Sequence, residues 1–172
     1  MMEEILKSEE EYLIKANEYL LDWDFLRAHR VLTELLEEEP CCGKAHAMMG
    51  EIKFFIQNEP ISALRHFKLA ILYTPNNFKP YTHFITVAKS MGKYKDAIIV
   101  IDKAYSIFFD QRDQLILYKA EIYEQQRKWK KSKVYYERAL ELSLNPNLES
   151  QMVSSIKRVT KKLNSKKGKK KK

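Results

Sequence analysis

The residues best suited to binding a metal are two adjacent cysteines and a histidine. Cys41 and Cys42 are followed by His46, four residues after the second cysteine. Thiolates and imidazoles are common zinc ligands, and a structural zinc site takes four of them. No fourth ligand lies nearby in the sequence, so the pattern favours a packed histidine and a turn over a metal site. A bond between neighbouring cysteines would be strained, and reduced thiols indicate the cytoplasm.

The other titratable residues form no pattern typical of catalysis. The four histidines include no pair spaced three or four residues apart, so no single helix presents two of them side by side. The carboxylates of residues 9–11 and 37–39 are consecutive runs, which are typical of solvated helix ends. The sequence lacks a glycine-rich phosphate loop, a nucleophile elbow and an HExxH motif. We therefore predict that the protein is not an enzyme and needs neither a cofactor nor a metal.

Positive charge is concentrated at the C-terminal end. Residues 157–172 hold ten of the 31 basic residues and no acid, so residues 1–156 carry 21 basic and 23 acidic side chains. Residues 164–172 are predicted to form a disordered lysine-rich tail. The tail serves either solubility alone or weak non-specific contact with nucleic acid or an anionic surface. No apolar run is long enough to span a bilayer, and the N-terminal residues are too polar for a signal peptide.

Small residues recur along the chain with spacings of 35, 34 and 35 residues. They fall where the second helix of each predicted helix pair begins, at Ala28, Ala63, Ala97 and Ser132. A large apolar residue follows each by four positions, at Leu32, Phe67, Ile101 and Tyr136. The first helices repeat a close-contact position of their own, at Ala16, Gly50, Ile85 and Ala120. One extra residue lies between Gly50 and Ala63, and Phe109 and Leu144 stand where the first two repeats have Pro40 and Pro75.

This pattern resembles the tetratricopeptide repeat family, whose unit is a helix–turn–helix of 34 residues. The resemblance covers roughly residues 9–145 and implies an all-α, right-handed helix-turn-helix solenoid of four repeats, at about 9–42, 43–77, 78–112 and 113–146. We expect the first helices near 9–21, 44–57, 79–91 and 113–126, and the second helices near 25–38, 61–73, 94–109 and 129–143. Residues 148–163 are predicted to form a capping helix that completes a domain of residues 1–163, with Asn147, just after Pro146, as its N-cap. Its apolar stripe consists of Leu148, Met152, Ile156, Val159 and Leu163.

The resemblance also implies a binding surface, because the first helices of this family line a concave groove that holds partner peptides. The groove positions transferred by resemblance are Leu13, Asn17, Lys44, Ala47, Met48, Glu51, Lys79, Thr82, His83, Thr86, Leu117, Tyr118 and Glu121. An ordinary solvated helix face is the alternative. Some family members clamp acidic chaperone tails, but Leu13, Met48 and His83 stand where that clamp needs polar or cationic donors, so we do not expect this ligand. Tyr118 is the strongest single candidate, since tyrosine is enriched among binding hot spots.

The predicted helix at 94–109 is apolar nearly all round. Ile99 stands where the first two repeats have Arg30 and Arg65, and Phe108 stands where they have Glu39 and Thr74. The pattern favours deeper burial of this helix. An exposed second apolar patch at Ile99 and Phe108, serving as an interface, is the alternative.

The sequence as a whole predicts a cytoplasmic protein-interaction module. In this interpretation an adaptor or scaffold presents its groove to a protein or peptide partner. The alternative is a nucleic-acid-associated protein in which the basic tail supplies affinity and the repeats recruit a partner. A small chaperone for secreted proteins is a third class that shares this type of repeat.

Overall fold

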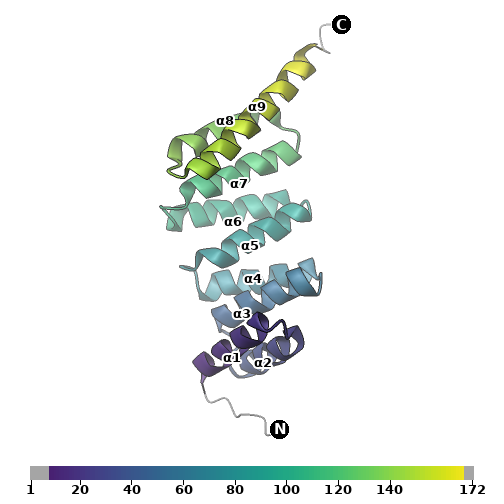
Figure 1. The fold of residues 1–172 in the computed structure, drawn as a ribbon, viewed down its shortest axis with the longest axis vertical. Helices are drawn as coiled ribbons and strands as arrows, with labels where there is room; N and C mark the ends of the chain where they lie inside the picture. Colours follow the sequence, from purple (N-terminus) through teal and green to yellow (C-terminus); the bar gives the residue numbers. More distant parts are fainter. Residues whose placement is uncertain (1–7, 169–172) are drawn as a thin grey trace. The chain divides into compact units, whose positions relative to one another are not determined.

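The computed structural model describes residues 8–168, and the side chains of residues 8–165, as helices joined by short turns (Figure 1). The described residues contain no strand, which confirms the all-α prediction. The elements are α1 (Glu9–Leu21), α2 (Phe25–Glu38), α3 (Gly43–Glu51), η1 (Ile52–Ile56), α4 (Pro60–Tyr73), α5 (Phe78–Ser90), α6 (Tyr94–Ile107), α7 (Arg112–Gln125), α8 (Trp129–Leu142) and α9 (Pro146–Gly168).

The turn inside each repeat has the same backbone geometry. One residue there is left-handed, with φ of 62° at Trp23, 53° at Asn58, 70° at Gly92 and 56° at Arg127. These positions are 35, 34 and 35 residues apart, which is also the spacing of the small residues that follow in each second helix. A left-handed residue ends a helix and reverses the chain. The backbone therefore supports the predicted repeat register independently of the side chains.

The extra residue of the second repeat is accommodated in a π-helical turn. The segment η1, Ile52–Ile56, continues directly from α3. A π-helical turn takes one residue more than an α-helical turn and is rare outside such short insertions. The insertion between Gly50 and Ala63 therefore does not shift α4 out of register, and Ala63 is fully buried like the small residues of the other repeats.

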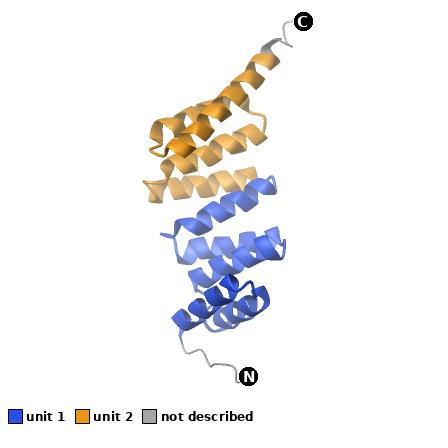
Figure 2. Cartoon of the chain, viewed as in Figure 1, with its two compact units in different colours: residues 1–92 blue, residues 93–172 orange. Residues whose placement is uncertain are grey.

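The chain divides into two compact units, residues 1–92 and residues 93–172 (Figure 2). The boundary falls between α5 and α6, inside the predicted third repeat. Each unit has a core of its own. The prediction of one domain over residues 1–163 stays a prediction.

In the first unit, small residues let paired helices approach closely. Ala16 and Ala28 are fully buried in α1 and α2, beside Leu32 and Leu35. Gly50 is the small residue that allows this close approach in the second repeat. A Cβ atom built on Gly50 would lie 2.6 Å from the ring of Phe67, closer than packed atoms approach. Only glycine fits this position while Phe67 keeps its place.

In the second unit, α9 covers α8 with its apolar stripe. The five stripe residues predicted from the sequence all pack in one core with Tyr136 of α8: Leu148, Met152, Ile156, Val159 and Leu163. An exposed repeat end leaves apolar surface in water, and a terminal helix of this kind buries it. The predicted capping helix is therefore confirmed.

Both ends of α9 differ from the prediction. The N-cap is Asn145, whose Oδ1 accepts from the backbone N–H of Asn147 at 3.0 Å, so Asn147 is not the cap. Pro146 takes the first helical position, where its missing N–H costs nothing. At the other end the helix continues to Gly168, since no helix breaker stands between Leu163 and Gly168. Residues 164–168 of the predicted disordered tail are therefore helical, and residues 169–172 lie outside the described part of the chain.

A partly buried carboxylate ties α9 to the last repeat. Arg158 donates from Nε and Nη2 to the two oxygens of Glu124, both at 2.8 Å. The hydroxyl of Tyr136 donates to Glu124 Oε2 at 2.8 Å. The hydrogen bonds from Arg158 are the main cause that lowers the pKa of Glu124. Two-pronged arginine–carboxylate contacts are directional, so they fix the rotation of α9 about its axis as well as its position.

Candidate functional site

Three of the predicted groove residues meet between α3 and α5 in the first unit. Lys79 Nζ lies 2.8 Å from Glu51 Oε1, and His83 Nδ1 lies 3.6 Å from the same oxygen. Burial is the main cause that lowers the pKa of His83; Glu51 opposes this shift and Lys79 adds to it. Among the described atoms His83 Nδ1 has no hydrogen-bond partner although it is buried. The cluster therefore combines an ion pair with a neutral imidazole whose buried nitrogen is not satisfied.

Aromatic side chains border this cluster. The ring of His83 meets Phe55 edge-on at 5.7 Å between centroids and Phe67 at 5.3 Å. Phe67 is fully buried, whereas Phe55 is 60% exposed. The cluster of Glu51, Lys79 and His83 thus lies beside one aromatic ring that is open to solvent, that of Phe55. Such a combination suits a partner that brings both an apolar group and hydrogen-bonding groups.

The remaining predicted groove residues of the first unit differ in accessibility. Those with exposed side chains are Asn17, Lys44 and Thr86. Those that are half-buried are Leu13, Met48 and Thr82. The structure does not support Ala47 as a groove residue, because it is buried and offers a partner little surface.

The second unit contributes three predicted groove residues on α7. Tyr118 is half-buried, its hydroxyl accepts from Gln114 Nε2 at 3.2 Å, and burial raises its pKa. Glu121 is also half-buried. The structure does not support Leu117 as a groove residue, because only 5% of it is exposed and it packs in the core shared with α8 and α9. Core packing sets the rotation of α7 about its axis, so that Leu117 faces the core and Tyr118 stays partly exposed.

The helix α6 is less buried than its apolar sequence predicts. Ile99 is 66% exposed, and Phe108 at the C-terminal end is half-buried. Phe109 is also 66% exposed, with the Arg112 guanidinium 4.1 Å from its ring centroid. The expectation of deeper burial is wrong at Ile99 and Phe109, because α6 buries only the narrow stripe of Ala97, Ile101 and Ala104. The apolar patch at Ile99 and Phe108 stays a prediction.

Neither a cluster of metal ligands nor a membrane-spanning helix is found among the described residues. There, no group of three or more His, Cys, Asp or Glu side chains is arranged to hold a metal ion. The two cysteines are free, Cys41 exposed and Cys42 buried. The Sγ atom of Cys42 accepts from the N–H of Ala45 and caps α3. Within the same described range, no helix is both long enough and apolar enough to cross a membrane.

Solved structures of other proteins share this architecture. The chain resembles YrrB, a TPR protein with an unusual peptide-binding site, at 14% identity and a TM-score of 0.70, over 84% of this chain and 73% of YrrB. It resembles TTC0263, a TPR protein of Thermus thermophilus, at 15% identity and a TM-score of 0.61, over 87% and 83% of the two chains. The chain has the tetratricopeptide-repeat fold. It also matches PilF of Pseudomonas aeruginosa at 18% identity and a TM-score of 0.67, over 87% of this chain and 69% of that one. In sequence, no protein-family model and no curated protein matches the chain.

Two features of the structure were not predicted from the sequence. Phe55 was not among the predicted residues, because its accessibility depends on the π-helical turn of η1. The second is the basic segment of residues 127–131, Arg-Lys-Trp-Lys-Lys. An aromatic residue among basic residues is a signal that the sequence did contain, outside the C-terminal tail where basic residues are most concentrated.

Two histidines from different helices of the second repeat face each other. His46 Nδ1 of α3 lies 3.1 Å from His66 Nδ1 of α4, and His46 Nε2 lies 3.0 Å from the carbonyl oxygen of Pro40. A carbonyl only accepts, so His46 carries its proton on Nε2. Burial lowers the pKa of His46, which favours the neutral ring, and the Nδ1 of a neutral His46 accepts from the Nδ1–H of His66.

The histidine pair makes the stability of the first unit depend on pH. Burial is the main cause that lowers the pKa of His66 from 6.5 to about 4, and repulsion from Lys53 and from the protonated forms of His46 and His29 adds to it. Burial also lowers the pKa of His46. The unfolded chain therefore binds more protons between these values, and stability present above pH 6.5 is lost as the pH falls through about 4. Because His66 is partly solvated, which screens its charge, we expect a loss of roughly 1–3 kcal/mol across this window in urea unfolding. His66→Phe should flatten this part of the profile, and an unchanged slope in that variant would contradict the assignment.

Proposed function

We propose that this chain is a non-catalytic interaction module, an adaptor or scaffold in the cytoplasm that presents the inner face of its first helices to a protein or peptide partner. The observation that carries the proposal is the cluster of Glu51, Lys79 and His83 beside the exposed ring of Phe55. These side chains come from two different repeats. A partner peptide that crosses both repeats would bury an apolar residue against Phe55 and pair its polar groups with the ion pair and the imidazole. The similarity to YrrB, a TPR protein with a peptide-binding site, supports this assignment.

The central test reverses one charge in the cluster. Lys79→Glu places two carboxylates where an ion pair stood, and we expect it to weaken partner binding by about 1–2 kcal/mol, roughly tenfold or more. Partners are captured from cells by the full chain and identified by quantitative mass spectrometry, and the affinity of each is then measured by titration. The matched control is Lys68→Glu, which makes the same charge change on the exposed surface of α4. Equal binding by wild type and Lys79→Glu would show that this cluster is not the partner site.

A second test addresses Tyr118 in the other unit. Tyr118→Ala removes a half-buried ring and a hydroxyl from α7. We expect it to weaken capture of the same partner by about 1–2 kcal/mol and to leave the melting temperature nearly unchanged. A much lower melting temperature would show that Tyr118 serves the core. If binding and stability are both intact, the exposed apolar surface around Ile99 becomes the next candidate.

A second candidate function is weak contact with nucleic acid or an anionic surface through the basic C-terminal end. It is favoured by the exposed side chains of Lys157, Lys161 and Lys162 on α9. The lysine side chains of residues 166–172 lie outside the described part of the chain. Binding of this kind weakens steeply as salt rises. RNA binding that is strongly salt-dependent and lost on deleting residues 164–172 would support it, and salt-tolerant capture of one protein that survives the deletion would favour the adaptor.

A further inference from the structure

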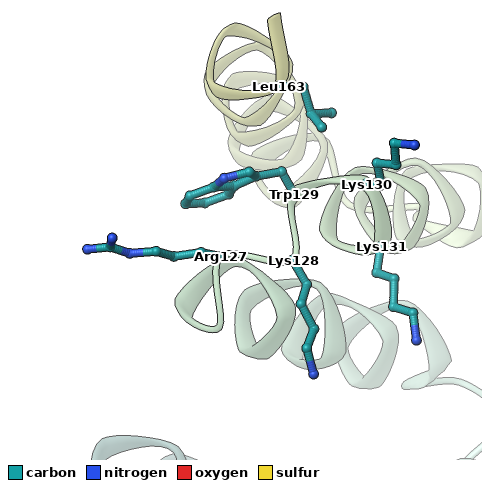
Figure 3. Close-up of a pocket in the computed structure, with 6 residues that line it drawn as sticks. All are labelled: Arg127, Lys128, Trp129, Lys130, Lys131 and Leu163. Atoms are coloured by element: carbon teal, nitrogen blue, oxygen red, sulfur yellow. The ribbon is translucent and has the colours of Figure 1, made fainter. Parts of the chain in front are cut away.

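A pocket of about 450 Å³ lies within the second unit, and none of its lining residues is a predicted groove residue. Its lining residues come from the turn before α8, from the first turn of α8 and from α9: Arg127, Lys128, Trp129, Lys130, Lys131 and Leu163. Figure 3 shows the basic side chains spreading outward around the start of α8, while Leu163 projects from α9. The pocket therefore has an apolar surface from Trp129 and Leu163 and a rim of four cations.

The four rim cations have no carboxylate partner among the described residues. The Nζ atoms of Lys128 and Lys131 lie 6.0 Å and 5.6 Å from the ring centroid of Tyr123. Glu124, on the preceding helix α7, is already bound by Arg158 and Tyr136 and lies 3.8 Å from Lys162 Nζ. Four like charges within five consecutive residues repel one another. An anion bound at this rim would relieve that repulsion and gain charge-assisted hydrogen bonds.

The N-terminus of helix α8 adds partial positive charge beside the rim cations. No side chain caps the N-terminus of α8, where Lys128 is the N-cap residue and Trp129 the first helical residue. The first N–H groups of a helix carry partial positive charge. Residues 93–172 as a whole hold 21 basic and nine acidic residues, against ten basic and 14 acidic in residues 1–92. The pocket thus lies in the basic unit, at a helix end that also favours anions.

The side chains that line the pocket favour a peptide carboxylate over a nucleic acid as the anionic ligand. Every lining side chain is either a hydrogen-bond donor or apolar, and none is an acceptor. The ring of Trp129 is half-buried, and Lys162 Nζ lies 4.6 Å from its centroid, so a part of the ring remains open to a ligand. A nucleobase would bring N–H donors that no lining side chain can accept. Carboxylates only accept, and an aliphatic or aromatic side chain needs no polar partner.

We propose that this pocket binds an acidic segment of another protein that carries a large apolar residue. The apolar residue enters between Trp129 and Leu163, and the flanking Asp or Glu side chains pair with the cations of residues 127–131. This surface is separate from the cluster on α3 and α5, so the proposal goes beyond the proposed function and does not depend on it. One chain would then hold two partners, or two segments of one partner.

The test uses the full chain and fluorescence anisotropy with a labelled probe, a short peptide of Asp and Glu with a single Phe at its centre. Two matched peptides replace Phe with Ser or all acids with their amides, and a single-stranded oligouridylate is the fourth probe. The site variant is Lys130→Glu with Lys131→Glu. Acidic residues are favourable in the first turn of a helix, so α8 should be retained, which circular dichroism checks. The control is Lys93→Glu with Lys95→Glu, which makes the same net charge change at exposed positions of the same unit.

We expect the acidic Phe peptide to bind, the Ser and amide peptides to bind about tenfold or more weakly, and the site variant to weaken the Phe peptide by a similar factor. The control should change affinity by much less. Equal losses from site and control variants would overturn the proposal, because binding would then follow net charge alone. Equal binding of the Phe and Ser peptides would also overturn it. So would binding of the oligouridylate that the site variant abolishes, in the absence of peptide binding, because the pocket would then be a nucleic-acid site.

Discussion

Phe67→Ala should lower the free energy of unfolding by about 3–5 kcal/mol. Phe67 is fully buried in α4, its ring packs over Gly50 of α3, and it meets His83 of α5 edge-on. Removing the ring leaves a cavity bordered by three helices. The backbone of α3 cannot fill it, because Gly50 has no side chain to extend. Urea-induced unfolding followed by circular dichroism measures the loss.

The matched control for this prediction is Leu72→Ala in the same helix. Leu72 is 62% exposed, and truncating such a residue changes stability within about 0.5 kcal/mol. Both variants remove a large apolar side chain from α4 and put alanine in its place. Equal losses from the two would show that the face of α4 assigned to the core is wrong.

Met152→Ala should have the second largest effect, a loss of about 2–5 kcal/mol. Met152 is fully buried at the centre of the α9 stripe and packs in one core with Ile116, Tyr136 and Val159. A cavity there weakens the docking of α9 on α8. The contact of Arg158 with Glu124 remains, but Arg158 is half exposed and a pair of this kind contributes little by itself. We therefore expect α9 to become sensitive to limited proteolysis while the rest of the unit stays helical.

Val153→Ala is the control for Met152→Ala, since Val153 is the next residue of α9 and is 37% exposed. It should alter neither the unfolding free energy nor the proteolysis pattern by a comparable amount. If Val153→Ala released α9 and Met152→Ala did not, the stripe would face solvent and α9 would not be a cap.

The repeat and the cap could be predicted from the sequence because both are local patterns. A small residue, with a large apolar residue four positions later, marks one helix face, and the repetition of that face every 34 or 35 residues requires no knowledge of distant contacts. The stripe from Leu148 to Leu163 is likewise contained in one helix. Helix ends were predicted to within about two residues wherever a proline, a left-handed residue or a small residue marks them. The Asn145 cap was missed because two asparagines flank Pro146 and only the backbone path decides between them.

The meeting of residues from different helices was decided only by the tertiary structure. His46 and His66 are 20 residues apart in the sequence, and Glu51 and Lys79 are 28 apart, so no periodic pattern relates them. The exposure of Phe55 follows from one π-helical turn, and Leu117 is buried because the core of α7, α8 and α9 takes that face. The pocket at Trp129 exists because α9 brings Leu163 to the start of α8. Sequence periodicity determines which face of each helix is apolar, whereas the side chains that meet depend on the packing of those faces in three dimensions.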